Sequence, residues 1–176
     1  MCLYHVSAQY YEERILWSAG VNVINNPNAD NTRFSLGEVE FKTPFFVGLE
    51  FKPSRLFGLE GVALSNKIRV YEFANGSYRE YDYRYLAADL NAKLYFEDLF
   101  TRRYQNSWDL FLVGGAGIYR MVGNNHLTLN FGGGGQFWLS KNLGLGIKAL
   151  GKVGIGSGFE QLNNYYQLNL GLMYRI

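Results

Sequence analysis

The sequence predicts an all-β fold, an eight-stranded antiparallel up-and-down transmembrane β-barrel, and three observations support this prediction. Apolar residues alternate with small or polar residues at a period of two over long segments, most clearly in residues 127–176. The second face of these segments holds glycines, amides and a few lysines, whereas a soluble sheet turns long charged side chains toward water. A small polar face suits the inside of a narrow closed barrel, and an aliphatic and aromatic face suits lipid. The 176 residues accommodate eight strands of about 10 residues with their connections, so residues 10–176 are expected to form one barrel domain.

Eight segments show the alternation, and three of them interrupt it. In the third segment Val62 and Leu64 share a face with Glu60, and a bulge at Gly61 would restore the phase. In the fifth, a run of small residues leaves the facing open, and in the seventh only Leu150 breaks the pattern. The expected strands cover residues 15–23, 45–52, 56–66, 85–96, 108–121, 127–139, 143–156 and 166–176.

The connections between these segments predict how the barrel is oriented. Residues 68–84 are expected to form a long loop or a hairpin that extends beyond the membrane. Because eight is an even number, both termini lie at the same end of the barrel, which in bacterial barrels is the periplasmic end. The rule of long outer loops and short inner turns fails at residues 97–107, which are long for a periplasmic connection, and at the short turn 122–125. The connections expected on the extracellular side are 25–43, 69–83, 122–125 and 157–164.

Composition argues against several functional classes. The 17 basic and 15 acidic residues give a net charge of +2, which offers no electrostatic reason to expect nucleic acid as a partner. Cys2 is the only cysteine and has no metal-ligand spacing around it, so we expect no disulfide, metal or other cofactor. No apolar run approaches the ~18 residues of a spanning helix, so a membrane crossing requires strands. Residues 1–9 are expected to be the remnant of a signal peptide or a disordered tail.

The faces assigned to the interior carry three acidic and three basic side chains. Unpaired charges inside a narrow barrel are costly, because each loses its hydration. We therefore expect a mutually compensating network that holds the strands in register and plugs the lumen, and the alternative is a small gated channel. The residues of this network are Glu50, Glu60, Asp89, Lys93, Lys148 and Lys152.

Aromatic residues near the strand ends are expected to mark the two membrane interfaces. Trp138 shares a face with Gln136, so its side chain is expected to plug the periplasmic end of the interior. The expected girdle residues are Trp17, Phe96, Trp108, Tyr166 and Tyr174.

Three segments, residues 111–119, 130–145 and 166–176, carry a resemblance to known small membrane barrels. Their sequences are FLVGGAGIY, NFGGGGQFWLSKNLGL and YQLNLGLMYRI. With them the chain resembles the OmpA-like and OmpX/Ail-like eight-stranded barrels and the broad "outer membrane protein beta-barrel" family of Gram-negative bacteria, and its richness in Asn and Tyr resembles Bacteroidota proteins. The resemblance implies a cell outer-membrane location, with membrane lipid and lipopolysaccharide as surroundings, and it is specific for architecture.

The resemblance also implies partners. The barrel-assembly machinery reads the last strand during biogenesis, and Ile176 departs from the Phe with which the family usually ends. The expected assembly signal is Tyr166, Leu168, Leu170, Leu172, Tyr174 and Ile176. A structural or surface-binding role through the extracellular loops is expected, with an unknown extracellular or periplasmic protein as a further partner. The candidate recognition residues are Arg69, Tyr71, Tyr78, Arg79, Tyr81, Tyr83 and Arg84.

An enzymatic alternative rests on His126 and Thr128. The run His126-Leu127-Thr128 resembles the His-x-Ser strand motif of the outer-membrane lipid A deacylases, in which histidine activates serine. Threonine replaces serine here, no acidic partner is identified, and the period of two turns both side chains inward, away from lipid. We therefore expect no catalytic site, and a lipid A deacylase-like enzyme is the alternative.

Overall fold

The computed structural model describes residues 15–25, 44–74, 77–96, 107–155 and 164–176, with the backbone alone for the parts of residues 68–82 inside these ranges. No helix in this part of the chain is long and apolar enough to cross a membrane. The expectation for residues 1–9 lies outside the described residues, as do the connection 97–106 and almost all of the connections 25–43 and 157–164.

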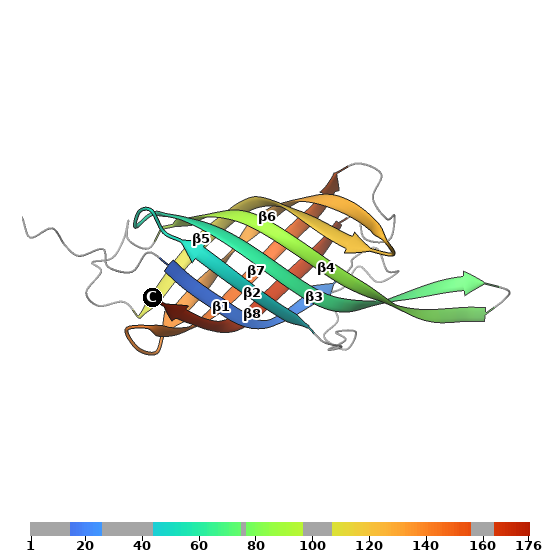
Figure 1. Cartoon of the computed structure of the whole chain (residues 1–176), viewed down its shortest axis with the longest axis horizontal. Helices are drawn as coiled ribbons and strands as arrows, with labels where there is room; N and C mark the ends of the chain where they lie inside the picture. Colours follow the sequence, from blue (N-terminus) through green and yellow to red (C-terminus); the bar gives the residue numbers. More distant parts are fainter. Residues whose placement is uncertain (1–14, 26–43, 75–76, 97–106, 156–163) are drawn as a thin grey trace, which may run out of the picture.

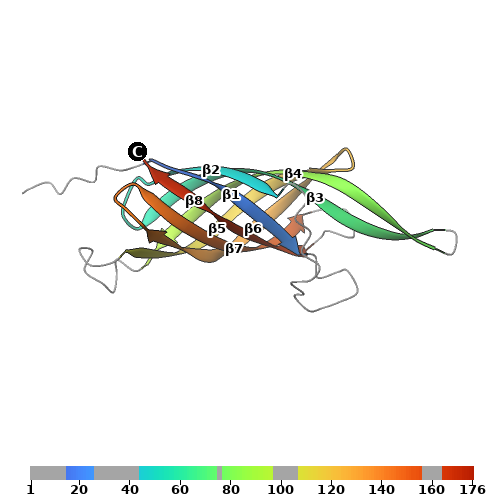
Figure 2. The same ribbon diagram turned by 90° about the horizontal axis from the view of Figure 1, so that it is seen from below.

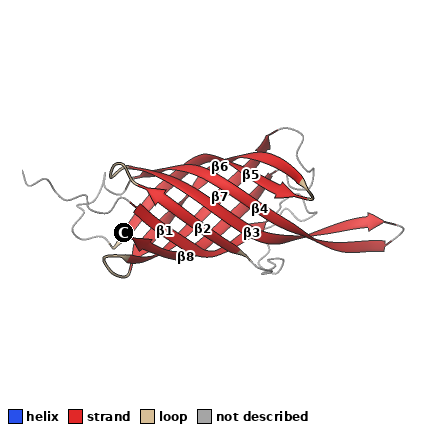
Figure 3. Ribbon diagram, viewed as in Figure 1, coloured by secondary structure: helices blue, strands red, loops and turns tan. Residues whose placement is uncertain are grey.

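Eight strands form a closed barrel in which each strand pairs with its neighbours in the sequence, and the first closes on the last. All pairs are antiparallel, so the predicted up-and-down topology is confirmed (Figure 1; Figure 3). The strands are β1 (Ile15–Asn25), β2 (Phe45–Phe51), β3 (Phe57–Ala74), β4 (Ser77–Tyr95), β5 (Trp108–Met121), β6 (Asn124–Trp138), β7 (Leu143–Ile155) and β8 (Asn164–Arg175).

The start of β1 and the end of β8 lie side by side at one end of the barrel. The backbone N–H of Ile176 donates to the carbonyl oxygen of Ile15 at 3.0 Å. At the opposite end β3 and β4 continue beyond the other strands as a two-stranded hairpin (Figure 1; Figure 2). Their pairing continues to Ala74 opposite Ser77. Of the two alternatives predicted for residues 68–84, a long loop or a hairpin, the structure therefore shows the hairpin.

The side chains of each strand point alternately into and out of the barrel, with the predicted period of two. Along β2 exposed and buried residues alternate without a break, and in β6 the outward Phe131 is 57% exposed while the inward Asn130 is 3% exposed. Because successive side chains of a strand point to opposite faces, one face of every strand lines the interior. The outer wall is consequently rich in exposed Leu, Ile, Val, Phe and Trp side chains, and the interior holds the buried polar and charged side chains, such as Asn91, Lys93 and Gln136.

The prediction of a bulge at Gly61 is wrong. Gly61 pairs in register with Leu49 on β2 and with Leu90 on β4, and the ladder is continuous on both sides. Val62 and Leu64 do share the inward face of Glu60, each with 4% of its surface exposed. They need no bulge because the interior has apolar layers of its own, in which these two side chains are packed.

The other two interruptions in the sequence pattern have the same explanation. In β5, the strand whose facing was open, Phe111 and Val113 point inward. They form an apolar cluster with Tyr95 and with Leu150, the residue that breaks the alternation in β7. The interior is therefore a sequence of polar and apolar layers.

The turn between β5 and β6 consists of two residues, Val122 and Gly123, and is shorter than the predicted connection 122–125 because β6 begins at Asn124. Val122 and Gly123 both have positive φ, 53° and 84°. Two successive positive φ values are typical of the type I′ hairpin turn, whose twist matches that of the strands it joins. This conformation suits Gly123 and strains the β-branched Val122.

Inward-facing glycines of β6 leave room for the backbone and side chains of the adjacent strands. A Cβ added to Gly134 would collide with the carbonyl oxygen of Ile147 and lie 2.7 Å from the Phe111 ring. The outward Gly114 has nothing within 4 Å of the corresponding position. Glycine at 134 is thus required by close approach inside the barrel.

Candidate functional site

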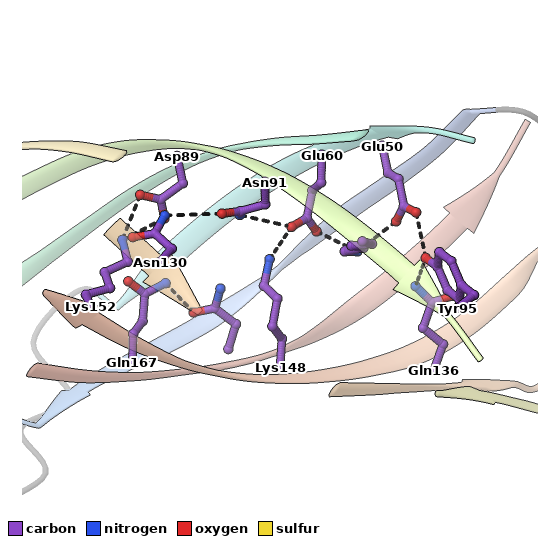
Figure 4. A network of polar contacts seen from close by, with 12 residues as sticks. Glu50, Glu60, Asp89, Asn91, Tyr95, Asn130, Gln136, Lys148, Lys152 and Gln167 are labelled. Carbon is purple, nitrogen blue, oxygen red and sulfur yellow. Dashed lines mark hydrogen bonds and ion pairs between the residues drawn. The ribbon is translucent and has the colours of Figure 1, made fainter. Parts of the chain in front are cut away.

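The largest ionic cluster of the interior joins four strands. Lys93 of β4 places its Nζ 2.7 Å from Glu50 Oε2 on β2 and 2.8 Å from Glu60 Oε1 on β3. The other carboxylate oxygen of Glu60 pairs with Lys148 of β7 (Figure 4). All four side chains are at least nine-tenths buried. Glu60 therefore bridges two lysines and ties opposite walls of the barrel together.

A second ion pair lies nearer the end with the β3–β4 hairpin. Lys152 Nζ donates to both carboxylate oxygens of Asp89 at 2.7 Å, and both side chains are almost completely buried. Two amides connect this level to the first cluster: Asn130 donates to Asn91 at 3.1 Å, and Asn91 donates to Glu60 at 3.4 Å (Figure 4). The structure thus brings all six residues of the expected network into ion pairs, three acids with three lysines.

The predicted network did not include Tyr95, Gln136 or Lys52. The hydroxyl of Tyr95 donates to Glu50 Oε1 at 2.6 Å and accepts from Gln136 at 3.0 Å. Lys52 Nζ lies 3.4 Å from the centre of the Tyr95 ring, a cation–π contact. Lys52 continues the inward face of Glu50 two residues on, so the period of two contained the information needed to find it.

The interior is covered at the end where β1 begins and β8 ends. Trp138 turns inward, and its indole N–H donates to Asp109 Oδ2 at 2.8 Å. The guanidinium of Arg175 stacks over the Trp138 ring at 3.7 Å. Trp138 thereby takes the inward position at the barrel end that its pattern predicts.

The hairpin end of the interior holds a tyrosine layer. The hydroxyls of Tyr85 and Tyr165 share a hydrogen bond of 2.6 Å, and the rings of Tyr85 and Tyr119 stack with centroids 5.4 Å apart. Met121 and Phe46 pack in the same cluster, and all five residues are at least 95% buried. This tyrosine layer fills the cross-section above the Asp89–Lys152 pair with aromatic side chains.

Between these layers a cavity leaves about 30 Å³ of space for water, and Glu60, Lys93 and Lys148 are among the residues that line it. A single water needs roughly 10–15 Å³ by the same measure, so the cavity has room for about two waters. Two of its lining amides have buried polar atoms without a partner among the described residues, Gln136 Oε1 and Asn169 Nδ2. Ordered water satisfies such atoms.

His126 and Thr128 face inward on β6, as the period of two predicts, but their side chains are engaged elsewhere. The His126 ring stacks on Tyr119 with centroids 4.9 Å apart, and its buried Nε2 has no partner in the described part of the chain. The Thr128 hydroxyl is buried and donates to Asn130 at 3.1 Å. Among the described residues, no three His, Cys, Asp or Glu side chains come together to hold a metal ion.

The last strand presents the residues expected for recognition during assembly. They alternate on the outer face of β8, where Tyr166, Leu170, Leu172, Tyr174 and Ile176 are more than half exposed and Leu168 less so. β8 pairs with β1 and with β7, so it closes the barrel. Of the candidate recognition residues on the hairpin, the structure describes the side chains of Tyr83 and Arg84 only.

No protein-family model and no curated protein matches the sequence. Solved structures do match over nearly the whole chain. The outer membrane protein OprG from Pseudomonas aeruginosa aligns with a TM-score of 0.63 at 10% identity, covering 93% of this chain and 96% of OprG. The N-terminal β-barrel domain of Pseudomonas aeruginosa OprF gives 0.56 at 7% identity, covering 94% and 100%. Ail of Yersinia pestis, in complex with the heparin analogue sucrose octasulfate, gives 0.52 at 14% identity, covering 93% and 97%. The chain therefore has the fold of the small outer-membrane β-barrels.

Proposed function

We propose that the protein spans the outer membrane as a closed barrel with both termini in the periplasm, and that it acts in a structural or surface-binding role at its extracellular end. The contrast between the two faces of the barrel wall carries this proposal. Leu90, Phe131 and Leu172 are more than half exposed on the outside, whereas Lys152 and Asp89 are buried and paired inside. In water this arrangement would expose a continuous apolar surface, and in a bilayer that surface is buried.

The layered interior supports a plugged lumen. In the described part of the chain, Trp138 with Arg175 lies at one end, the ion pairs lie in the middle beside the small cavity described above, and the tyrosine layer lies at the other end. An eight-stranded barrel has an interior just wide enough for side chains to fill, so ion conduction is not expected.

Surface binding is proposed for the end with the β3–β4 hairpin. Long connections on a rigid scaffold are where binding usually resides. The Ail complex holds a sulfated saccharide analogue, which makes sulfated saccharides the first class of ligand to test here. During biogenesis we propose that the barrel-assembly machinery reads the outer face of β8.

The test of membrane insertion compares boiled and unboiled protein on gels in detergent. A folded barrel migrates differently from the unfolded chain, and recovery from cells as a soluble monomer without detergent would overturn the proposal. Surface binding is tested by replacing residues 68–82 with a two-residue turn and crosslinking intact cells. Loss of a crosslinked partner from a variant that still folds supports the binding role.

The enzymatic alternative has its own test. Mass spectrometry of lipid A is compared in cells with the protein, without it, and with His126→Ala. The lipid A of cells with the protein would lack an acyl chain if the protein were a deacylase. If this loss persists after hairpin deletion and is abolished by His126→Ala, lipid A deacylation replaces the binding role.

A further inference from the structure

Three cations gather on the outer wall just above the apolar band, at the hairpin end of the barrel. Lys67 on β3 lies directly opposite Arg84 on β4, and Arg120 on β5 lies opposite Leu86, two residues further along β4. All three cations are exposed on the outer face. The register thus makes Lys67 and Arg84 direct cross-strand neighbours, and makes Arg84 and Arg120 diagonal neighbours, which typically lie ~7–8 Å apart.

Nothing in the described part of the chain neutralises this cation cluster, which consists of Lys67, Arg84 and Arg120. None of its side chains forms an ion pair or a hydrogen bond there. Like charges directly opposite each other on paired strands destabilise a sheet. The interior of the same barrel pairs its buried acids with lysines, so an unpaired cation cluster on the wall points to an external anion.

The wall next to the cation cluster is hollowed. One recess of about 340 Å³ is lined by Ala63, Ala88, Ile118 and Arg120, among others. A second, of about 320 Å³, is lined by Arg84, Leu86 and Arg120, among others. Leu86 and Arg120 border both recesses. The hollow exists because alanines stand on the outer face at 63 and 88, directly opposite each other in the register.

We propose that this hollow binds one phosphorylated lipid, with its phosphate on the cation cluster and an acyl chain along Ala63 and Ala88. Arginine binds phosphate through paired N–H groups, and basic pockets on membrane proteins take anionic head groups. The shallow alanine-lined recess leaves room for a hydrocarbon chain next to the cation cluster. This inference rests on the proposed orientation, which puts the hairpin end of the barrel in the outer leaflet of the outer membrane. The phosphorylated lipid of that leaflet is lipid A, the glycolipid of lipopolysaccharide, so lipid A is the proposed ligand.

The binding test uses native mass spectrometry of the folded full-length barrel in detergent, titrated with lipid A carrying two phosphates, with dephosphorylated lipid A and with phosphatidylglycerol. Wild-type protein is expected to retain the phosphorylated lipid A best. The variant K67Q/R84Q/R120Q is expected to bind it at least about tenfold more weakly, because three charge-assisted contacts are lost. The matched control R55Q/K141Q removes exposed cations at the opposite end and should bind like wild type.

The acyl recess is tested separately. Ala88→Phe fills the hollow and keeps every charge, so it should weaken lipid A binding, whereas Ala19→Phe on the outer face of β1 should not. Each variant is first shown to be folded, because its unboiled sample migrates differently from its boiled sample. The site would be overturned if K67Q/R84Q/R120Q or Ala88→Phe bound phosphorylated lipid A as tightly as wild type does. It would also be overturned if wild type bound dephosphorylated lipid A as tightly as phosphorylated lipid A. Tighter binding of phosphatidylglycerol would overturn the choice of lipid. A wild-type barrel that inserts into vesicles and retains no lipid refutes this inference alone, whereas failure to insert refutes the proposed function.

Discussion

Replacing Asp89 by Ala should destabilise the barrel by removing the sole carboxylate that pairs with Lys152 in the described structure. Both carboxylate oxygens of Asp89 lie 2.7 Å from Lys152 Nζ, and the lysine side chain has no measurable exposure. Breaking a buried ion pair by removing one partner costs about 3–5 kcal/mol, because the remaining charge is left without compensation. We expect the free energy of unfolding to fall by about this amount in Asp89→Ala.

The measurement is equilibrium urea unfolding of the barrel in lipid vesicles, followed by tryptophan fluorescence. Removing both charges, in D89A/K152M, should restore part of the loss, because no buried charge then remains without a partner. Lys141→Ala, an exposed cation at the terminus end, serves as the control and should change the unfolding free energy by less than about 0.5 kcal/mol.

Two results would refute this reasoning. A loss below about 1 kcal/mol in Asp89→Ala would mean that water reaches Lys152 and replaces the carboxylate. A double variant that is as unstable as the sum of the single variants would mean that the two side chains act independently.

Three further predictions follow from the packing. Purified protein in planar bilayers should give no large, stable single-channel currents, since side chains fill the lumen, and such currents would contradict the plugged interior. Gly134→Ala should lower the unfolding free energy by about 1–3 kcal/mol, since its Cβ would meet the backbone of Ile147. The control Gly114→Ala, on the outer face, should change the unfolding free energy by less than about 0.5 kcal/mol. Equal effects of the two substitutions in urea titrations would argue against close approach at Gly134. Val122→Asn should raise the unfolding free energy by about 1 kcal/mol, because Asn tolerates the positive φ of 53° better than a β-branched residue, and an unchanged urea midpoint would count against the strain.

The sequence by itself determined the architecture and the facing of most strands. Side chains of a strand alternate strictly, so a run such as residues 127–139 specifies which residues look inward before any pairing is known. The same alternation placed Glu50, Lys93 and Lys148 inside. The cost of unpaired buried charge then required that the acids and lysines meet.

The tertiary structure decided which charges meet. Lys93 pairs with both glutamates, and Asp89 is the one described carboxylate that pairs with Lys152, because the stagger between strands sets the height of each side chain along the barrel axis. That stagger depends on hydrogen-bond register between segments far apart in the sequence. A single sequence shows the alternation within each segment and gives no measure of the offset between segments.

The apolar layers are the second feature that only the tertiary structure decided. Val62 and Leu64 look like a phase error in the sequence, since apolar residues on an inward face contradict a purely polar interior. Tyr85 and Tyr165 lie 80 residues apart and meet through their hydroxyls. Once closure of the barrel brings them together, they form an apolar layer in which inward Val62 and Leu64 are stable. The physical reason is that period two specifies a side of the sheet, whereas the polarity of each layer depends on residues that eight separate strands deliver to the same height.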